Sequence, residues 1–557
     1  MGDYLVHFLE NLGVEYVFGI PGGTIEPLYN AMARSARRNG LRPVLARHES
    51  GAAFMAAGYA RETGKLGVCC STSGPGATNL LTGVASAFVD HTPLLVLTAE
   101  TPLPDLGRSA FQESSRTGVD MISMFQSCTH YASRVSHPRQ LPAKLFAATL
   151  RAMRLRRGPV HLSLPSDVLS SAGKGLQLPA GIQSLQWVSE AVDDRDVEFI
   201  LKCLGRARKV VLVIGKDCRG CSETLFRFAE LCGAQVVATP EGKTWALHNH
   251  PRFHGIFGFG GHESAHRTLL SEGADLVICA GTAFHEFDGL GKAGGHSGQT
   301  LIHVDEISDH LCFSPGADFH VYGSIRRLFH LLTTRLSMQS VASRKESSAP
   351  TASVDLPIKE SSGRIYPPWL IQELVRELPA KTRFVADTGN SFAWSTHFLK
   401  PERTGNYRVE MGFGSMGWGM GTAIGMAMGD RSTPVVCLHG DGSMLMNGQE
   451  LTVAVSERLP LITVVLNDGS LGMVRHGQKL AGAEEVCCDL PAVDFAMLAR
   501  SLGAEAFTIR TAKELKELDW PSLCRSSLPV LLDVHVDAEA CPPMKQRSAT
   551  LNFQKTA

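Results

Sequence analysis

Two aspartates stand at the ends of neighbouring apolar runs in the C-terminal third of this 557-residue chain. Asp441 follows the run PVVCL after two further residues, and Asp468 follows LITVVL after one. Uninterrupted apolar runs of this kind are typical of central strands in a parallel sheet, whose carboxyl ends meet at one edge. Carboxylates that lie close together repel each other unless a cation separates them, and such oxygen ligands suit Mg²⁺ completed by phosphate oxygens. The pair therefore predicts a magnesium site beside a bound phosphate group.

Glycines flank the first aspartate, and they bear on which phosphate ligand binds. Gly440 and Gly442 would let the backbone approach a phosphate closely. Taken singly, Asp441 would also suit a helix cap and Asp468 a turn, so the prediction rests on their pairing. Upstream, residues 412–417 spell G-x-G-x-x-G, which by itself indicates NAD. Because this turn and the acidic pair belong to one predicted domain, a diphosphate that carries Mg²⁺ fits better than a nicotinamide cofactor.

The composition is typical of a soluble globular protein and favours small molecules as its main partners. Hydrophobic residues make up 44% of the chain, and 54 basic residues balance 54 acidic ones. A zero net charge without basic runs argues against nucleic acid or an anionic membrane as the main partner. No apolar run approaches the roughly 18 residues of a membrane-spanning helix, and the acidic start MGDYLVHFLENLG is atypical of a signal peptide. Several of the fourteen cysteines lie in apolar runs, as expected for reduced thiols, and we expect a cytoplasmic protein.

Strand-like and helical stretches alternate along the whole chain, which indicates an α/β protein built on doubly wound parallel sheets. Two polar stretches interrupt the alternation, namely residues 171–187, rich in Gly, Pro, Ser and Gln, and the Ser-rich residues 337–364. They divide the chain into three predicted domains at 1–170, 188–336 and 365–540. A tail at 541–557 follows, without helical or strand periodicity.

One long stretch of the third predicted domain carries a resemblance to a known family. GDGSMLMNGQELTVAVSERLPLITVVLND (440–468) resembles the diphosphate-binding signature of thiamine diphosphate (ThDP) enzymes. The segments GVEYVFGIPGGTIEPLYNAM, RHESGAAFMAAGYAR, GRSAFQES, GSMGWGMGTAIG and GMVRHGQ are similar to the acetolactate (acetohydroxyacid) synthase catalytic subunit group. This resemblance covers the whole chain. It implies a pyrimidine-binding first domain, a central Rossmann-like domain and a third domain that binds the diphosphate and Mg²⁺.

The resemblance implies a set of cofactor contacts. Asp441, Asp468 and the backbone carbonyl of Ser470 would hold Mg²⁺, although the family usually has asparagine at position 468, so the aspartate adds a charge. Met416 matches the bulky residue that keeps the cofactor bent, and the backbones of Gly414 and Met416 would bond the aminopyrimidine. The remaining implied contacts are Pro21, Gly22, Gly389, Asn390, Ser391, Gly440, Gly442, Ser443, Leu471, Gly472 and Met473.

Glu49 begins an alanine-rich stretch that the pattern predicts to be helical. On its own it would suit a first-turn carboxylate that the helix dipole favours. The resemblance gives it a catalytic role, because it matches the carboxylate that bonds the pyrimidine ring and drives proton loss from the thiazolium. Gln112 matches a residue that faces the substrate. In this family the domains that hold Glu49 and Asp441 meet across a subunit interface, so a homodimer or homotetramer is implied.

The resemblance also implies an activity. The protein would be a carboligase that decarboxylates a 2-oxo acid, pyruvate, and joins the resulting enamine to a second carbonyl, as an acetolactate synthase-like transferase does. Two departures from the family's pattern concern the acceptor substrate. HGQ at 476–478 replaces the family's QWQ, and Ala283 replaces an arginine that binds the carboxylate of the acceptor. A 2-oxo acid decarboxylase or 2-hydroxyketone lyase is the alternative, and a silent partner subunit is a third. His48, Arg475 and His476 stay open between proton transfer, carboxylate binding and structural roles.

The central domain raises the question of a flavin. Its segments TPEGKTW, GIFGFGGHES and IHVDEISDH resemble the module that carries FAD in biosynthetic acetolactate synthases. Related enzymes keep this module and lose the flavin. The altered segment GTAFHEF (281–287) leaves a flavoprotein and a flavin-free enzyme both open.

Overall fold

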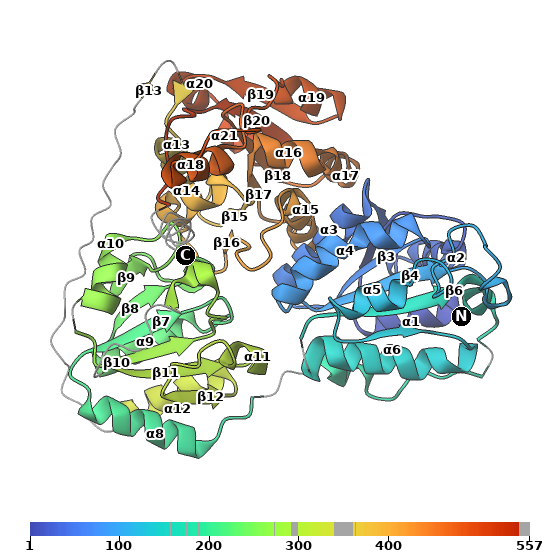
Figure 1. Ribbon diagram of the computed structural model, residues 1–557, viewed down its shortest axis with the longest axis horizontal. Helices are drawn as coiled ribbons and strands as arrows, with labels where there is room; N and C mark the ends of the chain where they lie inside the picture. The colour runs from blue at the N-terminus through green and yellow to red at the C-terminus, as the bar shows by residue number, and fades with distance from the viewer. Residues whose placement is uncertain are drawn as a thin grey trace.

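The computed structural model describes residues 1–338, apart from Arg156, Lys174, 187–189, Glu272 and 291–298, together with residues 360–361 and 364–544. These residues form three six-stranded parallel sheets with flanking helices, which succeed one another along the chain and make three lobes (Figure 1). The predicted class of three doubly wound α/β domains is thereby confirmed. Most of the predicted linker 337–364 and of the tail 541–557 lies outside the described residues.

The first sheet, in the blue and cyan lobe, has the strand order β2-β1-β3-β4-β6-β5. All of its neighbouring strands pair in parallel, which requires a crossover connection between them. Its strands are β1 (Tyr16–Gly19), β2 (Arg42–Leu45), β3 (Gly67–Ser71), β4 (Leu94–Glu100), β5 (Ala132–Arg134) and β6 (Pro159–Pro165). Its helices are α1 (Gly2–Asn11), α2 (Glu26–Ala36), α3 (Glu49–Thr63), α4 (Pro75–Val89), α5 (Met121–Gln126), α6 (Leu141–Leu150) and α7 (Ser166–Ser170).

The third sheet, in the orange and red lobe, has the order β16-β15-β17-β18-β20-β19, which repeats the order of the first sheet. Its strands are β15 (Arg383–Ala386), β16 (Tyr407–Arg408), β17 (Val435–Gly440), β18 (Leu461–Asn467), β19 (Glu505–Ile509) and β20 (Val530–His535). The helices are α13 (Pro367–Glu377), α14 (Asn390–Phe398), α15 (Trp418–Gly429), α16 (Asp441–Asn447), α17 (Leu451–Glu457), α18 (Gly472–Ala481), α19 (Phe495–Ser501), α20 (Ala512–Lys516) and α21 (Trp520–Leu523). The predicted strand pair is present, because β17 and β18 are parallel neighbours.

The central sheet has a different order, β12-β11-β10-β7-β8-β9, the arrangement of dinucleotide-binding folds. Its strands are β7 (Val210–Ile214), β8 (Gln235–Ala238), β9 (Phe253–Ile256), β10 (Leu276–Ala280), β11 (Thr300–Asp305) and β12 (Phe319–Tyr322). Its helices are α8 (Asp194–Arg206), α9 (Ser222–Cys232), α10 (Glu263–His266), α11 (Ser308–Leu311) and α12 (Ile325–Met338). A two-residue ribbon, β13 (Glu360–Ser361) with β14 (Arg364–Ile365), precedes the third sheet.

Helix α3 of the first lobe packs against α15 of the third lobe, and the two share one hydrophobic core (Figure 1). Glycines permit the close approach: a Cβ on Gly425 would lie 2.0 Å from the carbonyl oxygen of Met55, and one on Gly58 would lie 2.3 Å from that of Thr422. The small residues after Glu49 therefore allow α3 and α15 to pack closely.

Part of the stretch 171–187 is anchored in the first lobe, although its composition indicates a free linker. Residues Ile182–Gln186 form a short 3₁₀ turn, and Ile182 and Leu185 are buried in the core of the first lobe. Two apolar residues three positions apart on one turn suffice for this anchoring. Among the described residues, no helix combines the length and the apolar character needed to cross a bilayer.

Candidate active site

A cavity of about 240 Å³ opens at the carboxyl edge of the third sheet. The described residues that line it all lie between 367 and 540. They include every third-domain residue that the resemblance assigns to the cofactor: Gly389, Asn390, Ser391, Gly414, Met416, Gly440, Asp441, Gly442, Ser443, Asp468, Ser470, Leu471, Gly472 and Met473. Three helices, α14, α16 and α18, begin at this cavity, so their unpaired backbone N–H groups and positive dipole ends favour an anion there.

The two aspartates are held at this edge by backbone hydrogen bonds. Oδ1 of Asp441 accepts from the N–H of Gly442 at 2.8 Å, and Oδ2 accepts from Gly469 at 2.8 Å and from Ser470 at 3.2 Å. Oδ1 of Asp468 accepts from the N–H and the hydroxyl of Ser470, both at 2.9 Å. The turn after β18 is thus tied to the aspartate that follows β17. This fixes the relative position of the two carboxylates.

The electrostatics of this pair favour a bound cation. Burial raises the pKa of Asp441 to about 7, and the charge of Asp468 adds to the rise. Burial also raises the pKa of Asp468. Two neighbouring carboxylates whose charged forms are disfavoured gain most from a divalent ion with oxygen preference. The residues present therefore fit Mg²⁺.

Polar groups of the cavity also fit a diphosphate. The Thr388 hydroxyl and the Asn390 amide oxygen are buried and have no hydrogen-bond partner within the described part of the chain. The Asn390 amide nitrogen contacts His476 Nδ1 at 3.3 Å. A Cβ on Gly472 would lie 2.4 Å from Asp468 Oδ2 and 2.5 Å from Asn390 Nδ2, so glycine is needed where these two side chains meet.

Asp387 is a functional residue that the sequence reasoning missed. It is fully buried just after β15, and its carboxylate accepts from the N–H groups of Gly417 at 3.0 Å and Gly419 at 3.1 Å. His439 Nδ1 lies 3.0 Å from the same carboxylate. Asp387 thereby anchors the turn that presents Gly414 and Met416 to the cavity. The signal was available, because Asp387 ends an apolar strand just as Asp441 does.

The first-domain candidates gather at a different edge. Glu49 is 8% exposed at the start of α3, where Oε2 accepts from the Asn79 amide at 3.0 Å. Gly22 packs against Thr72, with only 2.6 Å between an added Cβ and the Thr72 Cβ. The half-buried Gln112 has a left-handed backbone (φ 57°) and lies against Gly74.

Pro21 is exposed beside this group. All of these candidates follow strands of the first sheet and thus lie at its carboxyl edge. Within one chain the structure does not bring them into the cavity that Asp441 lines.

A second missed residue, Glu450, connects the two lobes. It is fully buried in the third lobe, and its carboxylate accepts from the N–H of His48 at 2.8 Å and from the N–H of Arg47 at 3.1 Å. Burial raises the pKa of Glu450 to about 7, against these hydrogen bonds. Glu450 therefore holds the strand-to-helix turn that carries Glu49. Only the tertiary structure reveals this contact, because the partners are some 400 positions apart in sequence.

The three residues left open have distinct surroundings. His48 caps α3, since its Nδ1 accepts from the N–H of Ser50 at 3.2 Å. Arg475 pairs with Asp489 and lies 3.5 Å from Glu485. His476 is 3% exposed behind Asn390, and burial lowers its pKa. Of the three, His476 lies nearest the residues that line the cavity.

The central edge gives no support to the FAD prediction. A Cβ on Gly215 would lie 2.1 Å from the carbonyl oxygen of Gly281, and one on Gly242 would lie 2.0 Å from that of Ile214. These glycines let loops of the edge pack on one another, so they are explained without a bound flavin. FAD therefore stays a prediction.

Known sequences match along the whole chain. Residues 1–121 match the N-terminal TPP binding domain of thiamine pyrophosphate enzymes, residues 197–332 match their central domain, and residues 387–534 match their C-terminal TPP binding domain. "Acetolactate synthase" of Arthrospira platensis is 30% identical, over 97% of this chain and 95% of its own. "Acetolactate synthase isozyme 2 large subunit" of Escherichia coli strain K12 is 31% identical, over 96% and 95%.

"Acetolactate synthase large subunit" of Parasynechococcus marenigrum is 32% identical, over 97% of this chain and 88% of its own. Three domain matches in the family's order, together with identity of this level over nearly the whole length, go beyond a shared fold. The chain belongs to the thiamine pyrophosphate (ThDP) enzyme family, and it is a ThDP-dependent enzyme.

Proposed function

We propose that this enzyme decarboxylates pyruvate and transfers the remaining two-carbon unit to a second carbonyl compound, as an acetolactate synthase does. The names of the relatives support a role of this type. The observation that carries the proposal is the cavity of the third lobe, where three helix N-termini and two aspartates converge. Such a site suits a diphosphate with its divalent cation.

ThDP, when bound, supplies an electron sink for the pair of electrons released with CO₂. Asp441, Asp468 and the carbonyl of Ser470 would hold Mg²⁺ and, through it, the diphosphate. Met416 would support the bent cofactor from the 414–417 turn, which Asp387 anchors. Glu49 would hold a proton at the aminopyrimidine ring, in surroundings that exclude water. Gln112 would face the substrate.

We propose a homodimer, alone or paired into a homotetramer. The cavity in the third lobe and the edge that carries Glu49 are separate groups of residues within one chain. A complete site therefore needs the first-lobe edge of one chain against the third-lobe cavity of another. We also propose three domains, because each of the following ranges contains one sheet: 1–170, 188–336 and 365–540.

The positions at which this chain departs from the family's pattern bear on which acceptor substrate it uses. Ala283 is 2% exposed and offers no charge, where the resemblance expects an arginine. An arginine–carboxylate hydrogen-bonded pair contributes about 1.5–3 kcal/mol, so an acceptor carboxylate would bind one to two decades more weakly without it. This favours, as the second candidate, a decarboxylase or lyase that uses a proton or an uncharged carbonyl.

The test is incubation of the Mg²⁺- and ThDP-loaded enzyme with pyruvate, with products separated by mass. Acetolactate supports the carboligase, whereas acetaldehyde without acetolactate supports the decarboxylase. Neither product from pyruvate would contradict both activities on this substrate. The absorbance of cofactors released on denaturation tests FAD independently, because only a flavin absorbs in the visible range.

A further inference from the structure

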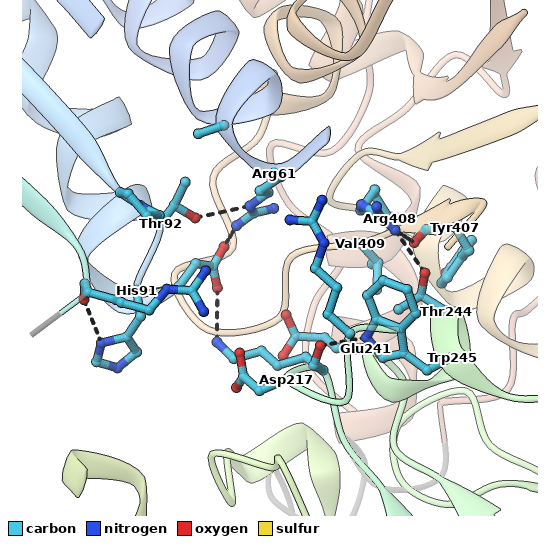
Figure 2. A pocket seen from close by; sticks show the side chains of 16 residues that line it. Arg61, His91, Thr92, Asp217, Glu241, Thr244, Trp245, Tyr407, Arg408 and Val409 are labelled. Atoms are coloured by element: carbon cyan, nitrogen blue, oxygen red, sulfur yellow. Dashed lines mark hydrogen bonds and ion pairs between the residues drawn. The ribbon is translucent and has the colours of Figure 1, made fainter. Parts of the chain in front are cut away.

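A second cavity, of about 130 Å³, lies where the three lobes meet. Figure 2 shows side chains from all three lobes turned toward it, with Arg61 and Thr92 on one side, Arg408 and Thr244 on another, and Glu241 and Asp217 below. No lining residue is shared with the cavity of the third sheet. A single water needs roughly 10–15 Å³, so this cavity has room for more than one water.

Positive charge exceeds negative charge in this lining. Five cationic side chains, Arg61, Arg157, Lys216, Arg219 and Arg408, face three carboxylates, Asp90, Asp217 and Glu241. His91 adds no charge near neutral pH, because burial lowers its pKa to about 3.

One carboxylate is already engaged by two of the cations. Asp90 pairs with Arg61, and its Oδ1 lies 3.6 Å from Lys216 Nζ. The buried Nζ of Lys216 has no hydrogen bond to any described residue. A buried ammonium with one distant ion partner has its hydrogen-bonding capacity unused.

Within the described part of the chain, the hydrogen-bond partners of two further cations are all neutral. The Arg408 guanidinium donates to the Thr244 hydroxyl at 2.8 Å and to the carbonyls of Gly405 at 2.7 Å and Tyr407 at 2.9 Å. Arg219, from the central lobe, donates to the carbonyl of Glu62 in the first lobe at 3.0 Å. Exclusion of water lowers the pKa of Arg408 to about 10; the charge of Glu62 opposes this shift, and the charge of Arg219 adds to it. Glu62 is thus one negative group that acts on both Arg408 and Arg219. A second negative group nearby would relieve both cations.

Among the described residues, neither of the two remaining carboxylates forms an ion pair with Lys216, Arg219 or Arg408, although the charge of Lys216 acts on Asp217. Asp217 Oδ2 lies 3.6 Å from His310 Nδ1, and burial raises the pKa of Asp217. Glu241 is 8% exposed and lies in the floor of the cavity, directly before a 3₁₀ turn that carries Thr244 and Trp245. Lys216, Arg219 and Arg408 thus converge from two lobes on a space with an excess of positive charge.

We infer that this junction is a binding site for a small oxyanion of the phosphate type, separate from the active site. The ammonium of Lys216 and the guanidinium of Arg219 would bond the anion from the central lobe, and Arg408 would bond it from the third. Because the site joins all three lobes, its occupation stabilises their arrangement. Tyr407 and Arg408 form β16, directly before the 409–417 segment that presents Met416, so the bound anion also steadies one wall of the cofactor cavity.

Inorganic phosphate is the probe, applied to the enzyme saturated with ThDP and Mg²⁺ so that the active site is already filled. Binding is measured by calorimetry at constant ionic strength, with chloride as the reference salt. We expect saturable binding by the wild type, and loss of each charged partner should weaken it about tenfold or more in Lys216→Met and Arg219→Met. Arg206→Met, an exposed arginine on α8, is the matched control and should bind as the wild type does.

A thermal shift checks that the variants fold. Phosphate should raise the unfolding temperature of the wild type and of Arg206→Met, and should raise that of Lys216→Met less at the same concentration. Absence of saturable phosphate binding by the wild type up to about 10 mM would overturn the inference and leave the junction a structural ion network. Binding that stays within about twofold of the wild type in both Lys216→Met and Arg219→Met would overturn it as well.

Discussion

The first and third sheets have the same strand order, yet their carboxyl edges are built for different tasks. At each edge an acidic residue begins a helix directly after a parallel strand region: Glu49 begins α3 and Asp441 begins α16. Asp441 accepts three backbone hydrogen bonds and lies beside a second aspartate. Glu49 accepts one side-chain hydrogen bond, is buried and begins a helix rich in small apolar residues. The topology sets where a site can form, and the immediate neighbours decide whether the carboxylate suits a metal or a proton.

The two edges also differ in enclosure. The third edge surrounds its own cavity, whereas the first presents Glu49, Gly22 and Gln112 as a group outside it. Under the proposed function these edges belong to one active site made by two chains. Substitutions at the first edge should therefore affect proton exchange, and substitutions at the third edge should affect cofactor binding. Four experiments test the two edges and the contact that joins the lobes.

The largest effect is expected for Glu49→Gln. Loss of the carboxyl proton should slow exchange of the C2 proton of bound ThDP by about 10²–10⁴-fold, the usual contribution of a positioned acid–base group. Proton NMR after rapid acid quench measures this exchange. ThDP affinity should change little, because the diphosphate and Mg²⁺ contacts lie at the other edge. Exchange at the wild-type rate would exclude Glu49 from the chemistry.

Asp441→Ala should act on binding rather than on proton exchange. It leaves the proposed metal with one carboxylate, so Mg²⁺-dependent ThDP affinity should fall about 100-fold, in the range of a lost charge-assisted contact. Titration followed by tryptophan fluorescence measures it. Asp468→Asn is the matched comparison, since an amide oxygen can still bind a metal, and its loss should be several times smaller. Equal losses in the two variants would contradict distinct roles for these positions.

Glu450→Gln tests the contact that joins the lobes. The folded state raises the pKa of Glu450 from 4.5 to about 7, so the folded protein keeps a proton that the unfolded chain has released. This contribution to stability is present below pH 4.5 and is lost as the pH rises to about 7. The wild type should lose about 2 kcal/mol more than Glu450→Gln between about pH 5 and 7.

Urea unfolding at several pH values measures the slope. The raised pKa of Asp441 acts in the same window, so only the difference between wild type and variant is informative. Parallel slopes in the two proteins would show that Glu450 does not titrate as its burial indicates.

The smallest effect is expected for Gly472→Ala. The added methyl would lie 2.4 Å from Asp468 Oδ2, so this side chain must move and ThDP affinity should fall about tenfold. Gly205→Ala on α8 is the control, since nothing lies within 4 Å of its added Cβ. An unchanged ThDP affinity in Gly472→Ala would show that the turn accommodates the added methyl group in spite of the close contact.

The sequence by itself determined the architecture and the composition of the third-lobe cavity. Apolar runs, their spacing and the aspartates at their ends are local features, and parallel pairing of β17 with β18 follows from one βαβ unit. The fourteen third-domain candidates that the resemblance implies all line one cavity, although their roles stay predictions. The same strand-end rule would have found Asp387.

Only the tertiary structure decided the contacts between lobes. The hydrogen bonds of Glu450 to the turn before Glu49, the glycine-mediated packing of α3 on α15, and the charged junction around Lys216 join residues far apart in the chain. Spacing along a sequence carries no signal for such pairs, because their proximity depends on how whole sheets dock. The separation of the Glu49 edge from the Asp441 cavity has the same origin, since it is the docking of the lobes that places them.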